Sequence, residues 1–130
     1  MLDAAEILGG KILVVDDQLA NVLLLQQMLR SGGYGAIEAT TDSAQVCRLH
    51  LLHHYDLILL DLQMPGRDGF QVLEDLRRIP SGRPPVLVIS AAPEHRAAVL
   101  KAGAQDFIAK PLHLDELLRR VHDLLEVAEP

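Results

Sequence analysis

Five polar residues follow apolar runs at four places along the chain. The stretch "KILVV" is followed by Asp16 and Asp17, and the stretch "DLILL" by Asp61. In the same way, "VLVI" is followed by Ser90 and "DFIA" by Lys110. Burying an unpaired carboxylate is costly, so an aspartate at the end of an apolar run needs a cation or a hydrogen-bond donor nearby. If the fold brings these residues together, they would suit the binding of a phosphoryl group.

The residue types also indicate how such a site would work. Three clustered aspartates would raise one another's pKa values unless a cation lies among them. Oxygen ligands without cysteine or histidine favour a hard ion such as Mg²⁺, which commonly bridges a carboxylate and a phosphate. Lys110 would add a point charge and Ser90 a hydrogen-bond donor, while one carboxylate could attack phosphorus as the nucleophile. The pattern therefore predicts a site that receives a phosphoryl group.

Each of these residues has a simpler explanation when it is taken alone. An aspartate pair after a strand is often the N-cap of the next helix, and Asp61 could cap the turn that leads to Pro65. A lone serine is more often a turn residue than a catalytic one, and a lone lysine usually lies on the surface. Their joint placement at strand ends favours the functional interpretation of the whole set.

The elements that must position these residues alternate along the chain. Apolar runs rich in valine, isoleucine and leucine predict strands at residues 11–17, 36–40, 56–62, 86–90 and 106–110. Helical spacing of apolar residues predicts helices at 21–33, 42–54, 68–79, 94–102 and 114–125. Strands that are apolar throughout are typical of a parallel sheet covered by helices on both faces. In such α/β folds, ligands bind beyond the carboxyl ends of the strands.

Composition narrows the class of protein. A chain of 130 residues, 49% of them hydrophobic, suits one compact domain. The single cysteine, Cys47, excludes an internal disulfide and fits a reducing cytoplasm. No apolar run approaches the roughly 20 residues of a membrane span, and the first residues do not resemble a signal peptide. A net charge of −6 argues against direct contact with nucleic acid.

The chain resembles the receiver domain of two-component response regulators over roughly residues 10–127. The motifs that carry the resemblance are "ILVVDD", "DLILLDLQMPGRDG", "VLVIS" and "GAQDFIAKP", in this order and spacing. The resemblance implies a flavodoxin-like, doubly wound α/β fold, with five parallel strands in the order 2-1-3-4-5 and five helices. It leaves residues 1–9 as an N-terminal tail, and residues 128–130 as a C-terminal tail or the start of a linker.

The resemblance also implies a role for each residue at the strand ends. Asp61 would be the phosphoacceptor and would take its phosphoryl group from the phosphohistidine of a sensor histidine kinase or phosphotransfer protein. Asp16 and Asp17 would hold Mg²⁺ together with Asp61 and the backbone carbonyl of Gln63. Lys110 would pair with the phosphoryl oxygens. The module would not be an enzyme in the usual sense, since it would catalyse only its own phosphorylation and dephosphorylation.

A conformational switch would follow phosphorylation in such a domain. Ser90 would swing to hydrogen-bond the phosphoryl group and Phe107 would turn inward, with Ala91 and Pro111 as supporting residues. Receivers use this motion to repack the surface formed by the fourth helix, fifth strand and fifth helix, which could also form a homodimer. The output would be a domain in the same chain or a partner protein. A cis bond between Lys110 and Pro111 is frequent in this family.

Two other functions fit parts of the pattern. A phosphohydrolase of the haloacid dehalogenase type uses a similar set of residues. Its nucleophile, however, normally opens the chain in a DxD motif, whereas Asp61 is central and Gln63 takes the place of the acid. A nucleotide-binding domain would need a glycine-rich turn, which "VVDDQLAN" lacks. The helical spacing of His50, His53 and His54 suggests a metal site, although a solvated polar face is the simpler explanation.

Overall fold

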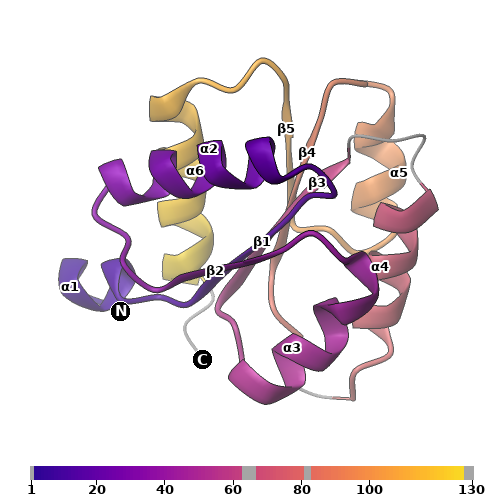
Figure 1. The fold of residues 1–130 in the computed structure, drawn as a ribbon, viewed down its shortest axis with the longest axis horizontal. Helices are drawn as coiled ribbons and strands as arrows, with labels where there is room; N and C mark the ends of the chain where they lie inside the picture. The colour runs from indigo at the N-terminus through magenta and orange to yellow at the C-terminus, as the bar shows by residue number, and fades with distance from the viewer. Residues whose placement is uncertain (1, 63–66, 81–82, 128–130) are drawn as a thin grey trace.

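A central parallel sheet organises the molecule (Figure 1). The computed structural model describes residues 2–62, 67–80 and 83–127. The five strands have the order β2-β1-β3-β4-β5, and every neighbouring pair is parallel. They are β1 (Ile12–Val15), β2 (Ile37–Thr40), β3 (Leu57–Leu62), β4 (Val86–Ser90) and β5 (Asp106–Ala109). The doubly wound, flavodoxin-like sheet expected from the sequence is confirmed.

Helices connect the strands, and the described residues hold six α-helices where five were expected. They are α1 (Ala4–Leu8), α2 (Leu19–Ser31), α3 (Val46–His53), α4 (Arg67–Arg77), α5 (His95–Lys101) and α6 (Leu114–Val127). A short 3-10 turn, η1 (Ser43–Gln45), precedes α3. The side chain of Asp42 accepts a hydrogen bond from the Ala44 N–H and closes this turn, so α3 begins at Val46 rather than directly after the cap.

Both faces of the sheet are covered, and the side chains of each strand divide between two core clusters (Figure 1). Helices α1, α2 and α6 pack on one face, whereas α3, α4 and α5 pack on the other. In β1, Ile12 and Val14 belong to the first cluster, while Leu13 and Val15 belong to the second. This is the period of two that a strand imposes on its side chains. Burial on both faces explains why the strands are apolar throughout.

The N-terminal segment differs from the tail expected over residues 1–9, because Ala4–Leu8 form α1. The helix begins with a capping box, in which the side chains of Asp3 and Glu6 each accept a hydrogen bond from the other residue's backbone N–H. Ile7 is 3% exposed and packs in the first core cluster. A helix of five residues is too short to form alone, so its contact with α6 must stabilise it.

Two further features surround the strand ends. The peptide bond between Lys110 and Pro111 is cis, as the resemblance implied. Near the start of α4, Gly69 passes so close to the end of β3 that an added Cβ would lie 1.7 Å from Leu62 Cδ2. Helix α4 therefore packs so closely against β3 that a side chain at position 69 would require Leu62 to move. Within the described ranges, every helix is too short or too polar to cross a bilayer.

Candidate functional site

The ends of three strands direct polar side chains to one side of the sheet. Asp16 follows β1, Asp61 lies within β3 and Lys110 follows β5. Because side chains alternate along a strand, each of the three continues the row that fills the first core cluster. Helices α2 and α6 cover that face. Three residues that are far apart in the sequence are thus brought to one place at the carboxyl edge of the sheet.

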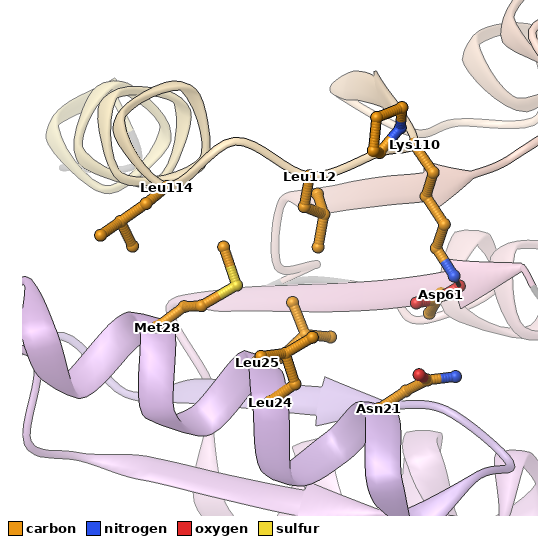
Figure 2. A pocket seen from close by; sticks show the side chains of 9 residues that line it. Asn21, Leu24, Leu25, Met28, Asp61, Lys110, Leu112 and Leu114 are labelled. Atoms are coloured by element: carbon orange, nitrogen blue, oxygen red, sulfur yellow. Dashed lines mark ion pairs between the residues drawn. The ribbon is translucent and has the colours of Figure 1, made fainter.

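Asp61 and Lys110 form an ion pair at this edge (Figure 2). Lys110 Nζ lies 3.0 Å from Asp61 Oδ1, and the two side chains are 23% and 2% exposed. A carboxylate that is this deeply buried needs a partner, because desolvation disfavours its charge. The ion pair explains how an aspartate is tolerated in an otherwise apolar strand.

Asp16 is the second buried carboxylate of the site and is 1% exposed. Its Oδ1 accepts a hydrogen bond of 2.9 Å from the Gln18 N–H, whereas its Oδ2 has no hydrogen-bond partner among the described residues. Burial raises the pKa of Asp16 from 3.8 to about 7; the Gln18 hydrogen bond lowers it and the nearby charge of Asp61 raises it. A buried oxygen without a donor, beside a second carboxylate, fits the needs of a divalent cation.

The other expected ligands of a metal ion are Asp17 and Gln63. Asp17 is exposed beside Asp16, and Gln63 lies outside the described residues. Among the residues that are described, no group of three or more His, Cys, Asp or Glu side chains is arranged as a metal site. Mg²⁺ usually retains several waters and needs only one or two carboxylates from the protein, so the donors present fit this ion.

Ser90 and Phe107 belong to the opposite face of the sheet. Ser90 ends β4 and is 1% exposed, and Phe107 of β5 is 3% exposed in the second core cluster. The inward turn implied for Phe107 would start from an outward ring, whereas the ring is already buried in this structure. Of the two supporting residues, Ala91 is exposed and Pro111 lines the groove described next.

An apolar groove with a volume of about 440 Å³ runs from the ion pair along α2 (Figure 2). The residues that line it are Asn21, Leu24, Leu25, Met28, Asp61, Lys110, Pro111, Leu112 and Leu114. Figure 2 shows the ion pair at one end of the groove, with Met28 and Leu114 at the other. Leu24 is 52% exposed and Leu114 45% exposed. The apolar spacing that predicts helices at 21–33 and 114–125 does not separate side chains buried in the core from side chains that line an open groove.

The three histidines near α3 do not form a metal site within the described structure. His50 is buried, and its Nδ1 accepts a hydrogen bond of 3.1 Å from the Tyr55 N–H. His53 and His54 are exposed. The solvated face expected for this group therefore holds for His53 and His54, whereas His50 fixes the chain reversal that leads into β3.

Sequence reasoning missed a fourth histidine that touches the site. His95 Nδ1 lies 3.2 Å from Ser90 Oγ. A histidine five positions after a serine belongs to no motif, and only the turn between β4 and α5 brings the two side chains together.

Comparisons with known proteins agree on one family. Residues 12–122 match the model of the response regulator receiver domain. The cell cycle response regulators CtrA of Brucella ovis and Brucella abortus (strain 2308) are 35% identical to this chain over 118 residues, which is 88% of this chain and 50% of each relative. The chain thus spans half the length of these curated relatives.

Solved structures give the same result. The receiver domain of a sensor histidine kinase from Pseudomonas aeruginosa PAO1 has a magnesium ion coordinated in its active-site cleft. It is 32% identical, with a TM-score of 0.79 over 91% of this chain and 98% of that one. The signal receiver domain of a signal transduction histidine kinase from Syntrophus aciditrophicus is 31% identical, with a TM-score of 0.79 over 92% of both chains.

Proposed function

The chain belongs to the response regulator receiver domain family of two-component signalling, and from this premise we propose that it accepts a phosphoryl group on Asp61. The observation that carries the proposal is the ion pair between Asp61 and Lys110, placed beside the buried carboxyl group of Asp16. The ion pair gives the Asp61 carboxylate, whose side chain is 2% exposed, a cationic partner. An ionised carboxylate is what nucleophilic attack on phosphorus requires.

The transfer uses these residues in distinct roles. A carboxylate oxygen of Asp61 attacks the phosphorus of a phosphohistidine, the P–N bond breaks, and the donor imidazole leaves with the electron pair. Lys110 shifts from the carboxylate towards the phosphoryl oxygens and offsets their charge. Mg²⁺, held by Asp16, Asp17, Asp61 and the backbone carbonyl of Gln63, would neutralise charge that develops on the transferred group.

The donor is a sensor histidine kinase or a phosphotransfer protein, and the groove beside Asp61 is where it docks. The groove presents leucine side chains that are half exposed, and it ends at the nucleophile. A partner that buries these side chains would gain hydrophobic free energy while placing its phosphohistidine next to the carboxylate. The groove thus links recognition of the donor with the site of transfer.

The output passes through the surface formed by α5, β5 and α6. Ser90 turns towards the new phosphoryl group, and β5 adjusts at Phe107. Arg120 of α6 connects these elements, because its Nη1 donates to Asp106 Oδ1 at 2.7 Å and to the Phe107 carbonyl at 3.3 Å. A movement of β5 would therefore be transmitted to α6 through these two hydrogen bonds. This surface controls an output domain or partner protein, or forms a homodimer.

Phosphorylation by acetyl phosphate with Mg²⁺, read by intact mass, tests the proposal. We expect a gain of one phosphoryl group in the unchanged chain and in an Asp123→Asn control, where an exposed carboxylate is removed. The Asp61→Asn variant should gain none. Equal labelling of that variant would contradict the assignment, and repeated turnover of a phosphate monoester would favour a phosphohydrolase instead.

Docking in the groove needs a separate test. Leu24→Gln should slow transfer from a phosphorylated sensor kinase but leave labelling by acetyl phosphate unchanged. Leu51→Gln is the matched control, because Leu51 is 58% exposed on α3, outside the groove, and Leu24 is 52% exposed. If both variants slow the kinase reaction equally, the groove is not the docking surface.

A further inference from the structure

The hydroxyl of Ser90 is held by two contacts on the side of the sheet away from Asp61. Its Oγ accepts a hydrogen bond of 3.0 Å from the Ala92 N–H and lies 3.2 Å from His95 Nδ1. By the alternation of side chains in β4, Ser90 continues the row that faces α3, α4 and α5. Asp61 continues the row that faces α2 and α6. The two side chains start on opposite faces of the sheet.

The contacts around Ser90 Oγ favour one assignment of donor and acceptor. The Ala92 N–H can only donate, so Ser90 Oγ is the acceptor in that contact. If His95 Nδ1 also donated to Oγ, the hydroxyl proton of Ser90, which is 1% exposed, would have no acceptor among the described residues. Buried donors are almost always paired, which favours the arrangement in which Ser90 donates to an unprotonated Nδ1.

The imidazole is itself fixed in place. The backbone N–H of His95 donates to the Ala92 carbonyl at 3.0 Å, which closes the turn between β4 and α5. The ring packs edge-on against Phe70 of α4, with ring centroids 6.2 Å apart and an interplanar angle of 81°. Two neighbouring elements thus hold Nδ1 where the serine proton can reach it.

We propose that His95 is a positioning residue that holds the Ser90 hydroxyl away from Asp61 until Asp61 is phosphorylated. The inference rests on the proposed function, because the Ser90 hydroxyl gains a competing hydrogen-bond acceptor only if a phosphoryl group forms on Asp61. In reaching that group, Ser90 gives up its hydrogen bond to His95. The imidazole therefore sets part of the free-energy difference between the resting and switched states, and so the fraction of molecules that switch.

Four proteins test this inference: the unchanged chain, His95→Phe, Ser90→Ala, and the double variant. Phenylalanine keeps a ring against Phe70 but removes the acceptor. The readout is the affinity for beryllofluoride with Mg²⁺, followed by NMR of the backbone amides. We expect His95→Phe to bind about two- to tenfold more tightly, the effect of one neutral hydrogen bond. In the Ser90→Ala background, the same substitution should change the affinity little.

A fifth protein, the variant His95→Asn, distinguishes the loss of the hydrogen bond from a merely structural effect. His95→Asn places an amide oxygen near the position of Nδ1, so it should restore an affinity close to that of the unchanged chain. Thermal unfolding of all five proteins shows whether packing has changed. A loss of packing alone would alter unfolding and would persist when Ser90 is replaced.

The outcomes separate this inference from the function on which it rests. If beryllofluoride binds the unchanged chain and Asp61→Asn equally, or binds neither, the proposed function fails and the role of His95 fails with it. If binding depends on Asp61 but His95→Phe changes nothing, only the role of His95 is overturned. The role of His95 is also overturned if His95→Phe changes the affinity equally with serine and with alanine at position 90.

Discussion

Replacing Asp16 with asparagine should stabilise the metal-free protein at high pH and have little effect at low pH. Burial raises the pKa of Asp16 from 3.8 to about 7 in the folded protein. Between these two values, the folded state binds more protons than the unfolded state. The stability that the protonated carboxyl group contributes is therefore complete below pH 3.8 and is lost as the pH rises through about 7.

The size of this loss follows from the proton count. One extra bound proton changes the free energy of unfolding by at most about 1.4 kcal/mol per pH unit. Across the interval from 3.8 to about 7 this sets a ceiling of about 4 kcal/mol. Because the nearby charge of Asp61 contributes to the raised pKa of Asp16, we expect a loss below this ceiling, about 1–3 kcal/mol relative to the variant between pH 5 and pH 8.

Asparagine is the matched substitution because its oxygen still accepts the hydrogen bond from the Gln18 N–H. The assay is urea unfolding of both proteins at several pH values in the presence of a chelator, with Asp123→Asn as a control for loss of an exposed charge. Added Mg²⁺ should restore the stability of the unchanged chain at pH 8, but not stabilise Asp16→Asn. Parallel stability curves for the two proteins from pH 5 to pH 8 would refute the reasoning.

Three further substitutions test other parts of the site and fold. Lys110→Met should slow labelling by acetyl phosphate about tenfold or more, because the charge that balances the buried carboxylate is lost; an unchanged initial rate would contradict this. Gly69→Ala should destabilise the protein by about 1–3 kcal/mol in urea unfolding, since its Cβ would lie 1.7 Å from Leu62 Cδ2, whereas Gly35→Ala, with open space around it, should be near neutral. Ile7→Ala should cost about 2–4 kcal/mol in the same assay if α1 belongs to the core, and almost nothing if residues 1–9 are a tail.

Much of the fold could be predicted because its strands are buried on both faces. Such strands are continuous apolar runs, and their alternation with helical patterns leaves few arrangements other than a covered parallel sheet. The same logic located Asp16, Asp61 and Lys110, since the ends of parallel strands share one edge. The period of two then explains why these three face α2 and α6 together, while Ser90 faces the opposite layer.

What could not be predicted depends on contacts between distant segments. Helix α1 is too short to show apolar periodicity, and it is stable only because Ile7 packs in the first cluster. A solvated face is the simpler expectation for His50, whereas the turn into β3 buries this side chain against Tyr55. The contact between Ser90 and His95 depends on the path of one turn, which propensity and spacing do not specify.

Chemical trapping of the phosphorylated residue is the most direct test of the central claim. The chain is labelled with acetyl phosphate and Mg²⁺ and reduced with borohydride, which converts an aspartyl phosphate to homoserine; peptide mass spectrometry then locates the product. We predict homoserine at position 61 and at no other aspartate. Homoserine at position 16 or 17, or its absence from a chain that gained a phosphoryl group, would contradict the account.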